Sequence, residues 1–458
     1  MKRIVVFGAG MVAGAHVDYL LNVPDFQVTV ASRTLDKAQA LVKDHPRGHA
    51  VQVNSDDEAA LAALIAEADL AVSLLPYAYH PAVARLCIQH GVHMVTTSYV
   101  KEAMAALDGA ARAAGVILLN EIGVDPGIDH MTAMRIIHGV QARGGRIVKF
   151  VSWCGGLPAP EANDNPFGYK FSWSPKGVLL AGKNPAHYLW DGQDVVIPGG
   201  ELFDHYWTVP VAVEGETIGF DGYPNRDSLP YMQTYGIEAP QTFFRGTLRY
   251  PGWCQTLRKI AELGLLEETP LEGLENATFA QFTARLTGSD QHNVRAALAA
   301  YLDLTLDSPV IDNLAWLGFL SDEPLPAGRV AGGRVAERIE TQRIETIPID
   351  VLTARMLQKM QYAPGERDML VLQHQFEAAY PDGRERIVST MVDFGQPHGY
   401  TSMARTVGLP AAIAVKLILH GQIDLLGVQT PVAPEIYTPV LEELEALGIR
   451  FVETFERI

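Results

Sequence analysis

The residues of this chain that could perform acid–base or nucleophilic chemistry follow its buried apolar runs. Tyr99, Asp125 and Cys154 each come at or shortly after the end of such a run. A phenol or a carboxylate can exchange a proton with a substrate, and a thiolate is a nucleophile. Each also has an ordinary structural role, as a packed tyrosine, a turn aspartate or an inert core thiol. On local chemistry alone that ordinary role is the commoner one for all three residues.

Cationic side chains beside glycines and aromatics form a second candidate set. Arg226 lies in the segment YPNRD, and Arg245 and Arg249 lie in RGTLRY; Lys170 stands among aromatic residues. A guanidinium matches a carboxylate with two parallel hydrogen bonds. Because the formal net charge is −17, an anionic substrate must be met by a local cluster of this kind. Surface ion pairs are the alternative role for these cations.

The first fourteen residues predict a dinucleotide site. Residues 4–7 are apolar and mostly β-branched, which is typical of a strand buried on both faces of a parallel sheet. Gly8 then permits a tight turn, Gly10 lets a pyrophosphate approach the backbone, and Ala13 lets the next helix sit close. An incidental glycine turn is the alternative, and the strand–turn–helix context disfavours it.

The end of the second predicted strand indicates which dinucleotide is bound. Residues 27–31 are apolar and lead into Ser32, Arg33 and Thr34. An NAD site usually places Asp or Glu here for the ribose 2′-hydroxyl, and none is present. Arg33 between two hydroxyls suits a 2′-phosphate, although it could also be an ordinary solvated loop residue. The sequence therefore predicts NADP(H) as the cofactor.

Strand and helix patterns alternate through residues 1–128, which predicts an α/β fold with a Rossmann-type doubly wound parallel sheet. Ligands of such sheets bind beyond the carboxyl ends of the strands, so these ends are expected to line one cleft. His80 and His130 are interpreted as helix-start residues. Residues 254–340 are predicted to be mainly helical. A C-terminal strand at residues 450–455 is expected to return to the first sheet.

Composition limits the class of protein. The 458 residues predict two or three domains, and 48% hydrophobic with 19% charged residues is typical of a soluble globular protein. The negative net charge disfavours nucleic acid or an anionic membrane as partner. Three scattered cysteines predict neither a metal site nor a disulfide framework. No signal peptide and no apolar run of membrane-spanning length is recognised, so the cytoplasm is the expected location.

Long ordered motifs identify a family. The chain resembles the saccharopine reductases, the NADP-dependent, L-glutamate-forming saccharopine dehydrogenases of lysine metabolism. The motifs that carry this resemblance cover nearly the whole chain. They are SLLPY at 73–77, TSY at 97–99, NEIGVDPGIDH at 120–130, CGGLPAPE at 154–161, DNP at 164–166, GYKFSWS at 168–174, YPNRD at 223–227 and RGTLRY at 245–250.

The resemblance implies a homodimer of three-domain subunits. An NADP-binding Rossmann-type domain would comprise residues 1–128 and about 400–458. A second α/β domain, which binds saccharopine and carries the dimer contacts, would comprise residues 129–253 and about 345–399, with a helical insert at 254–344. The implied reaction interconverts saccharopine, NADP⁺ and water with L-glutamate, 2-aminoadipate 6-semialdehyde and NADPH.

The resemblance also implies roles for residues at matching positions. Asp125, aided by Cys154 and Tyr99, would handle protons at the reacting amine. Substrate would be bound by Ser98, Tyr99, Asp125, Cys154, Lys170, Phe171, Arg226, Arg245, Gly246 and Thr247. NADP would be bound by Gly8, Gly10, Met11, Val12, Ala13, Ser32, Arg33, Thr34, Asn54, Leu75, Pro76, Tyr77, Ser98, Val124 and Ser174.

Two other interpretations stay open at this point. A sister enzyme would act on another amine–carboxylate pair, as in lysine-forming saccharopine dehydrogenation or carboxy(nor)spermidine synthesis. A non-catalytic NADP-sensing regulator would use the same scaffold without turnover, because fold does not fix function. The joint presence of Tyr99, Asp125, Cys154 and the arginines argues against the regulator.

Overall fold

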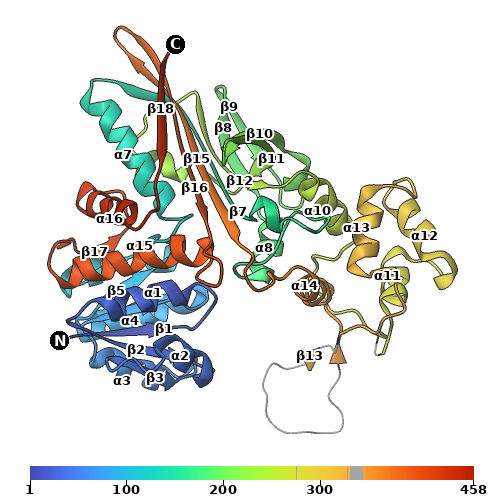
Figure 1. The fold of residues 1–458 in the computed structure, drawn as a ribbon, viewed down its shortest axis with the longest axis horizontal. Helices are drawn as coiled ribbons and strands as arrows, with labels where there is room; N and C mark the ends of the chain where they lie inside the picture. Colours follow the sequence, from blue (N-terminus) through green and yellow to red (C-terminus); the bar gives the residue numbers. More distant parts are fainter. Residues whose placement is uncertain (275, 327–328, 331–343) are drawn as a thin grey trace. The chain divides into compact units, whose positions relative to one another are not determined.

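The computed structural model describes residues 1–274, 276–326, 329–330 and 344–458, and the chain divides into two compact units (Figure 1). Unit 1 consists of Met1–Cys154, Tyr231–Pro240 and Arg367–Ile458, and unit 2 of Gly155–Pro230 and Gln241–Glu366. The three-domain division stays a prediction. Residues 275, 327–328 and 331–343 of its helical insert lie outside the described part of the chain.

Unit 1 begins with a seven-stranded sheet in the order β17-β6-β5-β4-β1-β2-β3, and all neighbouring strands are parallel. The strands are β1 (Lys2–Phe7), β2 (Phe26–Ser32), β3 (Gly48–Gln52), β4 (Leu70–Ser73), β5 (His93–Thr96), β6 (Ile117–Leu119) and β17 (Gly427–Gln429). The connecting helices are α1 (Ala13–Asn22), α2 (Leu35–Val42), α3 (Glu58–Ala66), α4 (His80–His90), α5 (Glu102–Ala105) and α6 (Asp108–Ala113).

The order of these strands confirms the predicted Rossmann-type fold class. The chain winds outward from β1 through β2 to β3, then returns to the other side of β1 with β4, β5 and β6. The apolar residues 4–7 are buried as predicted, with at most 2% of each exposed. The reversal of strand order between β1 and β4 creates the crevice in which such sheets bind ligands.

Unit 1 also contributes strands to a nine-stranded sheet. They are β15 (Asp368–Tyr380), β16 (Gly383–Phe394), β18 (Val452–Arg457) and the part of β7 (Arg146–Pro158) up to Cys154. Strands β15 and β16 form a long hairpin, and β18 pairs antiparallel with β16. The expected return of the C-terminal strand to the first sheet is therefore wrong. The segment that joins the first sheet is the short strand β17, which pairs with β6. Helices α7 (Ile128–Ala142), α15 (Ser402–Leu419) and α16 (Pro434–Ala446) complete this unit.

Helix α15 corrects another expectation. Its 18 residues have a mean hydropathy of 1.4, enough by length and composition to cross a membrane, although no such run was recognised in the sequence. Within the fold, 83% of this segment is buried. It packs closely against α1, because a Cβ added to Gly408 would lie only 3.0 Å from the His16 amide nitrogen. The apolar character of α15 is that of a helix enclosed by protein on most sides.

Unit 2 combines an antiparallel sheet with helices. Strand β12 pairs with β11 and β8, β11 pairs with β10, and β8 pairs with β9. The strands are β8 (Ala186–Trp190), β9 (Gln193–Ile197), β10 (Trp207–Val213), β11 (Glu216–Pro224) and β12 (Thr242–Arg249). The longer helices are α8 (Pro175–Ala181), α10 (Trp253–Glu262), α11 (Phe279–Thr287), α12 (Val294–Tyr301), α13 (Pro309–Leu317) and α14 (Pro348–Lys359). Among the described residues of 254–340, helices α10 to α13 agree with the predicted helical character, whereas Arg329–Val330 forms strand β13.

Two buried histidines of unit 1 predict a loss of stability in mild acid. Burial lowers the pKa of His16 and of His80 from 6.5 to about 4. Both side chains are therefore neutral in the folded state, whereas the unfolded chain protonates them near pH 6.5. The contribution of these neutral side chains to the free energy of unfolding is fully present above pH 6.5. It is lost as the pH falls toward 4, by roughly 2–3 kcal/mol for each histidine. Urea unfolding at pH 7 and pH 4.5 should show that His16→Gln flattens this dependence, whereas replacing the exposed His292 by Gln leaves it unchanged.

Candidate active site

The glycine turn after β1 has the shape that a dinucleotide pyrophosphate needs. Gly8 has φ +111°, and a Cβ there would lie 2.9 Å from the carbonyl oxygen of Leu74. A Cβ on Gly10 would meet no heavy atom within 4 Å, so the backbone at Gly10 is open. Helix α1 begins next, at the fully buried Ala13, and its N-terminal amides favour an anion. These residues fit the phosphates of NADP.

The end of β2 is built to present Arg33. The Thr34 amide donates to the Ser32 hydroxyl at 3.2 Å, and the Gln52 side chain donates to the Arg33 carbonyl at 3.0 Å. Both bonds fix the backbone, while the Arg33 side chain is exposed. Asn54, beyond the end of β3, is also exposed. A cationic fork beside two hydroxyls is suited to a phosphate monoester.

Arg33→Ser should therefore weaken NADPH binding selectively. A hydrogen-bonded contact to a charged group contributes about 1.5–3 kcal/mol, so the dissociation constant for NADPH should rise about 10–100-fold. The dissociation constant for NADH, which lacks the 2′-phosphate, should rise by less than about twofold. Fluorescence titration with both nucleotides measures this, with Arg85→Ser on an exposed position of α4 as the control. An equal loss for the two nucleotides would show that Arg33 does not contact the 2′-phosphate.

A buried histidine links the ends of β4 and β5. His80 Nδ1 lies 2.8 Å from the Ser73 hydroxyl, and His80 Nε2 lies 2.7 Å from the Ser98 hydroxyl. Because burial lowers the pKa of His80 to about 4, the ring is neutral and one nitrogen donates while the other accepts. His80 is the first residue of α4, as interpreted from the sequence, and it also holds Ser98. Tyr77, three residues before His80, is 60% exposed. The ammonium of Lys101 lies over its ring, 3.6 Å from the ring centroid.

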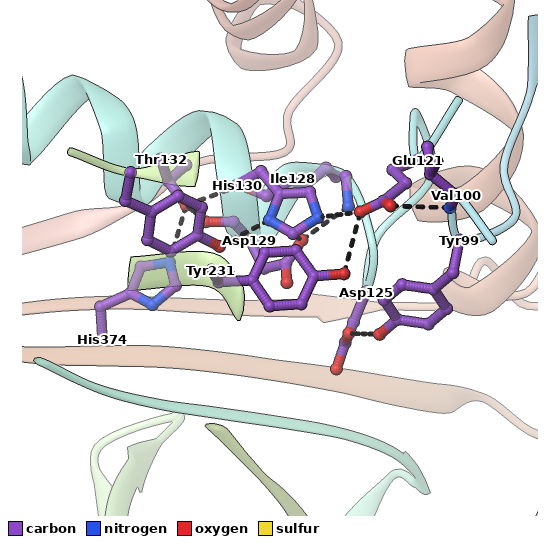
Figure 2. A network of polar contacts seen from close by, with 12 residues as sticks. Tyr99, Val100, Glu121, Asp125, Ile128, Asp129, His130, Thr132, Tyr231 and His374 are labelled. Atoms are coloured by element: carbon purple, nitrogen blue, oxygen red, sulfur yellow. Dashed lines mark hydrogen bonds and ion pairs between the residues drawn. The ribbon is translucent and has the colours of Figure 1, made fainter. Parts of the chain in front are cut away.

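Tyr99 and Asp125 come together beyond the ends of β5 and β6. The Tyr99 hydroxyl donates to Asp125 Oδ1 at 2.6 Å (Figure 2). The loop that carries Asp125 turns tightly, because the Gly123 amide donates to the Pro126 carbonyl at 2.9 Å and the Ile128 amide to the Gly123 carbonyl at 2.9 Å. The Asp125 carboxylate thus has a phenol partner from another loop, which a turn aspartate bonded only to its own backbone would lack.

Cys154 occupies a different place from the one expected. The sequence suggested the end of a strand and a glycine loop, but β7 continues without interruption from Arg146 to Pro158. Cys154 therefore lies inside a strand, with 9% of the residue exposed. The glycine that follows is required by packing, because a Cβ on Gly155 would lie 2.7 Å from the Leu248 carbonyl oxygen.

Unit 2 brings two predicted carboxylate-binding segments together. Strands β11 and β12 pair so that Tyr223 faces Thr247 and Pro224 faces Gly246. The Asn225 amide then donates to the Arg245 carbonyl at 3.0 Å. The segment around Arg226 and the segment Arg245–Gly246–Thr247 are therefore neighbours through sheet pairing. Arg245 is 2% exposed, so its charge is desolvated and suited to an anion.

Lys170, predicted to bind substrate, already has two carboxylate partners in unit 2. Its ammonium lies 2.8 Å from Glu366 and 2.9 Å from Asp164. Burial lowers the pKa of Lys170, but the bonds to these two acids outweigh burial and the net shift is upward. Phe171 is buried, and its amide donates to the Met360 carbonyl at 3.0 Å. Ser174 caps α8 by accepting the Gly177 amide.

The predicted residues thus fall into two sets. Unit 1 carries the glycine turn with Met11 and Val12, the Arg33 segment, the loop after β4 with Leu75 and Pro76, and the Tyr99–Asp125 pair with Val124. Unit 2 carries the arginine segments, Lys170, Phe171 and Ser174. The specific roles of these residues stay predictions.

Comparison with known proteins places the whole chain in one family. Residues 4–119 match the saccharopine dehydrogenase NADP-binding domain, and residues 123–449 match the saccharopine dehydrogenase C-terminal domain. The NADP(+), L-glutamate-forming saccharopine dehydrogenase of Schizosaccharomyces pombe is 40% identical over 468 residues, which cover 99% of each chain. The mitochondrial alpha-aminoadipic semialdehyde synthase of Mus musculus is 37% identical over 98% of this chain but only 47% of its own length.

A solved structure agrees with this. The apo L-Glu-forming saccharopine dehydrogenase of Saccharomyces cerevisiae matches with a TM-score of 0.87 and 37% identity, covering 100% of both chains. The likeness therefore extends over the Rossmann-type unit and the remaining architecture alike. The chain belongs to the family of NADP-dependent, L-glutamate-forming saccharopine dehydrogenases.

Proposed function

We propose that the protein interconverts saccharopine, NADP⁺ and water with L-glutamate, 2-aminoadipate 6-semialdehyde and NADPH, as an oxidoreductase of lysine metabolism. The observation that carries this is the full-length likeness to L-glutamate-forming enzymes, at 40% identity over 99% of the chain. The NADP dependence predicted from Arg33 is confirmed by the same relatives and by the matching NADP-binding domain. Lysine-forming and polyamine-forming sister reactions are not favoured.

The chemistry needs protons moved at a single nitrogen. NADP⁺, which the glycine turn at Gly8 and Gly10 and the Arg33 segment would hold, would supply the hydride acceptor for the carbon that becomes the aldehyde. The secondary amine loses its N–H proton as the C=N bond forms, and water then adds to that carbon. When the C–N bond of the carbinolamine breaks, its hydroxyl loses a proton as the C=O bond forms, and the nitrogen takes up a proton and leaves as the amino group of glutamate. One group that alternately accepts and returns a proton can serve each step.

Asp125 is the proposed acid–base group. Its carboxylate lies beyond β6, at the edge where the sheet binds ligands, and the Tyr99 hydroxyl orients it at 2.6 Å. Cys154 assists through water in this proposal. The predicted cofactor contacts hold NADP, and the buried Arg245 with Arg226 binds carboxylates of saccharopine, which has three.

The reductive direction tests the proposed substrates. Purified protein should oxidise NADPH when L-glutamate and 2-aminoadipate 6-semialdehyde are both present, and saccharopine should accumulate in equal amount. Lysine with 2-oxoglutarate, offered instead, should give no turnover. Turnover with the second pair alone would assign the sister reaction, and NADPH binding without turnover on either pair would support the regulator.

We also propose a cytoplasmic homodimer. Strand β18 is at the edge of its sheet and exposes Val452 and Phe455, at 70% and 55%. Exposed apolar residues on an edge strand favour pairing with another chain. Light scattering should give twice the mass of one chain, and Phe455→Lys should lower it toward the monomer.

A further inference from the structure

One buried glutamate holds the backbone on both sides of Tyr99. Glu121 follows β6, and 3% of it is exposed. Its amide donates to the Ser98 carbonyl at 3.1 Å, and its Oε1 accepts the Val100 amide at 2.8 Å. Tyr99 lies between these two anchored residues, and Figure 2 shows its phenol directed at Asp125. Asp125 itself belongs to the loop that Glu121 begins.

The other carboxylate oxygen of Glu121 is bound by the first turn of α7 and by a helix from another part of the chain. Oε2 lies 2.7 Å from His130 Nε2 and accepts the Tyr231 hydroxyl at 3.2 Å. A carboxylate only accepts, so His130 carries its proton on Nε2 when the acid is ionised. His130 Nδ1 lies 2.5 Å from the Tyr235 hydroxyl, and its ring stacks on Tyr231 at 5.2 Å. The acid is thus fully engaged although it is removed from water.

The backbone at Glu121 adds an independent sign of function. Its φ is +57°, a left-handed conformation that non-glycine residues seldom adopt, and burial of a carboxylate is costly unless it is well paired. A chain that needed only the turn would be served better by glycine. Strained, over-determined positions of this kind concentrate at functional sites.

We propose that Glu121, held in place by His130, is the positioning residue that fixes Tyr99 against Asp125. This rests on the proposed function, in which Asp125 moves protons and Tyr99 orients it. Glu121 ties the loop after β5 to the loop after β6 through two bonds around Tyr99, so the separation of phenol and carboxylate depends on it. A misplacement of about 1 Å at a reacting group can cost about 100-fold in rate.

A double-mutant cycle tests this link. Tyr99→Phe and Glu121→Ala should each lower kcat about tenfold or more, with the KM for NADP⁺ within about twofold of the unchanged protein. If Glu121 acts through Tyr99, the double variant should be no more than about twofold worse than the poorer single variant. Glu121→Gln keeps an acceptor for the Val100 amide, so it should recover part of the loss. If the Glu121→Ala variant fails to fold, Glu121→Gln takes its place in the double-mutant cycle.

Thr132→Val is the matched control. Thr132 lies on the same helix α7 and bonds to His374 at 2.9 Å, but it makes no contact with the Tyr99 loop in the network of Figure 2. Its kcat should stay within about twofold. Multiplied losses in the double variant, or a loss in Thr132→Val equal to that in Glu121→Gln, would overturn the proposal.

Crystal structures of the unchanged protein and of Glu121→Gln and Glu121→Ala separate this proposal from the proposed reaction. The Tyr99 oxygen should move away from Asp125 by more than about 1 Å in the alanine variant, whether or not saccharopine is turned over. An unmoved Tyr99 would overturn the positioning role. Absence of saccharopine turnover in the unchanged protein, with Tyr99 displaced in the variant, would contradict only the proposed function.

Discussion

Asp125→Ala is expected to lower kcat for saccharopine oxidation about 100-fold or more, while NADPH affinity stays within about twofold. General acid–base catalysis by one positioned side chain typically contributes a factor of about 100–10,000. The Tyr99 hydroxyl donates to this carboxylate at 2.6 Å and orients it, and in the proposed reaction the same carboxylate moves the protons. Steady-state kinetics and nucleotide titration measure the two quantities separately.

Asp125→Asn is the companion variant because it keeps the size of the side chain and the acceptor for the Tyr99 hydroxyl. It should lose nearly as much kcat as the alanine variant, since an amide cannot take up a proton. Near-normal turnover in both variants would remove Asp125 from the acid–base role. A loss of kcat in Asp125→Ala but not in Asp125→Asn would show that Asp125 is a packing or binding residue.

Gly127→Ala is expected to abolish the native loop that carries Asp125. Gly127 has φ +147°, and an added Cβ would lie 2.1 Å from the Gly123 carbonyl oxygen and 2.4 Å from its carbon. Those are backbone atoms, so no side-chain rotation relieves the clash. The loss in free energy of unfolding should exceed about 4 kcal/mol, or the loop should rearrange with loss of activity. Urea denaturation and saccharopine turnover measure these outcomes.

Gly91→Ala separates backbone strain from the clash. Gly91 also has positive φ, +66°, but a Cβ there would meet nothing within 4 Å. It should cost only about 1 kcal/mol and leave kcat unchanged. Equal costs for the two variants would show that the close approach of Gly127 to Gly123 is unimportant.

The parts of this protein that were predictable are those with local signals. The buried run before Gly8 and the glycine turn identify the first strand and the phosphate site, because each residue type there answers a constraint within a few positions. The missing acid beside Arg33 identified the cofactor in the same local way. Cys154 was misplaced because Gly155 and Gly156 are typical of a loop, whereas here a glycine is needed for the close approach of Leu248.

Roles that depend on distant partners could not be obtained from local patterns. The predicted binding of substrate by Lys170 stays a prediction, and no local pattern indicated its acidic partner Glu366, which is 196 positions away. Strand β18 is largely exposed, so no alternation of apolar residues indicated its pairing with β16. The sequence showed Glu121 only as part of the motif at 120–130 and indicated for His130 only a place at the start of a helix, which α7 confirms. Their proposed positioning role depends on Tyr231, which is 110 residues from Glu121, and on the contact between the loops that follow β5 and β6.

The most direct test incubates the purified protein with saccharopine and either NADP⁺ or NAD⁺, follows reduced nicotinamide, and identifies the amino acid released by mass spectrometry. We expect L-glutamate in equal amount to the NADPH formed, with NADP⁺ preferred over NAD⁺. Release of lysine would contradict it, because the other C–N bond would then be the one broken.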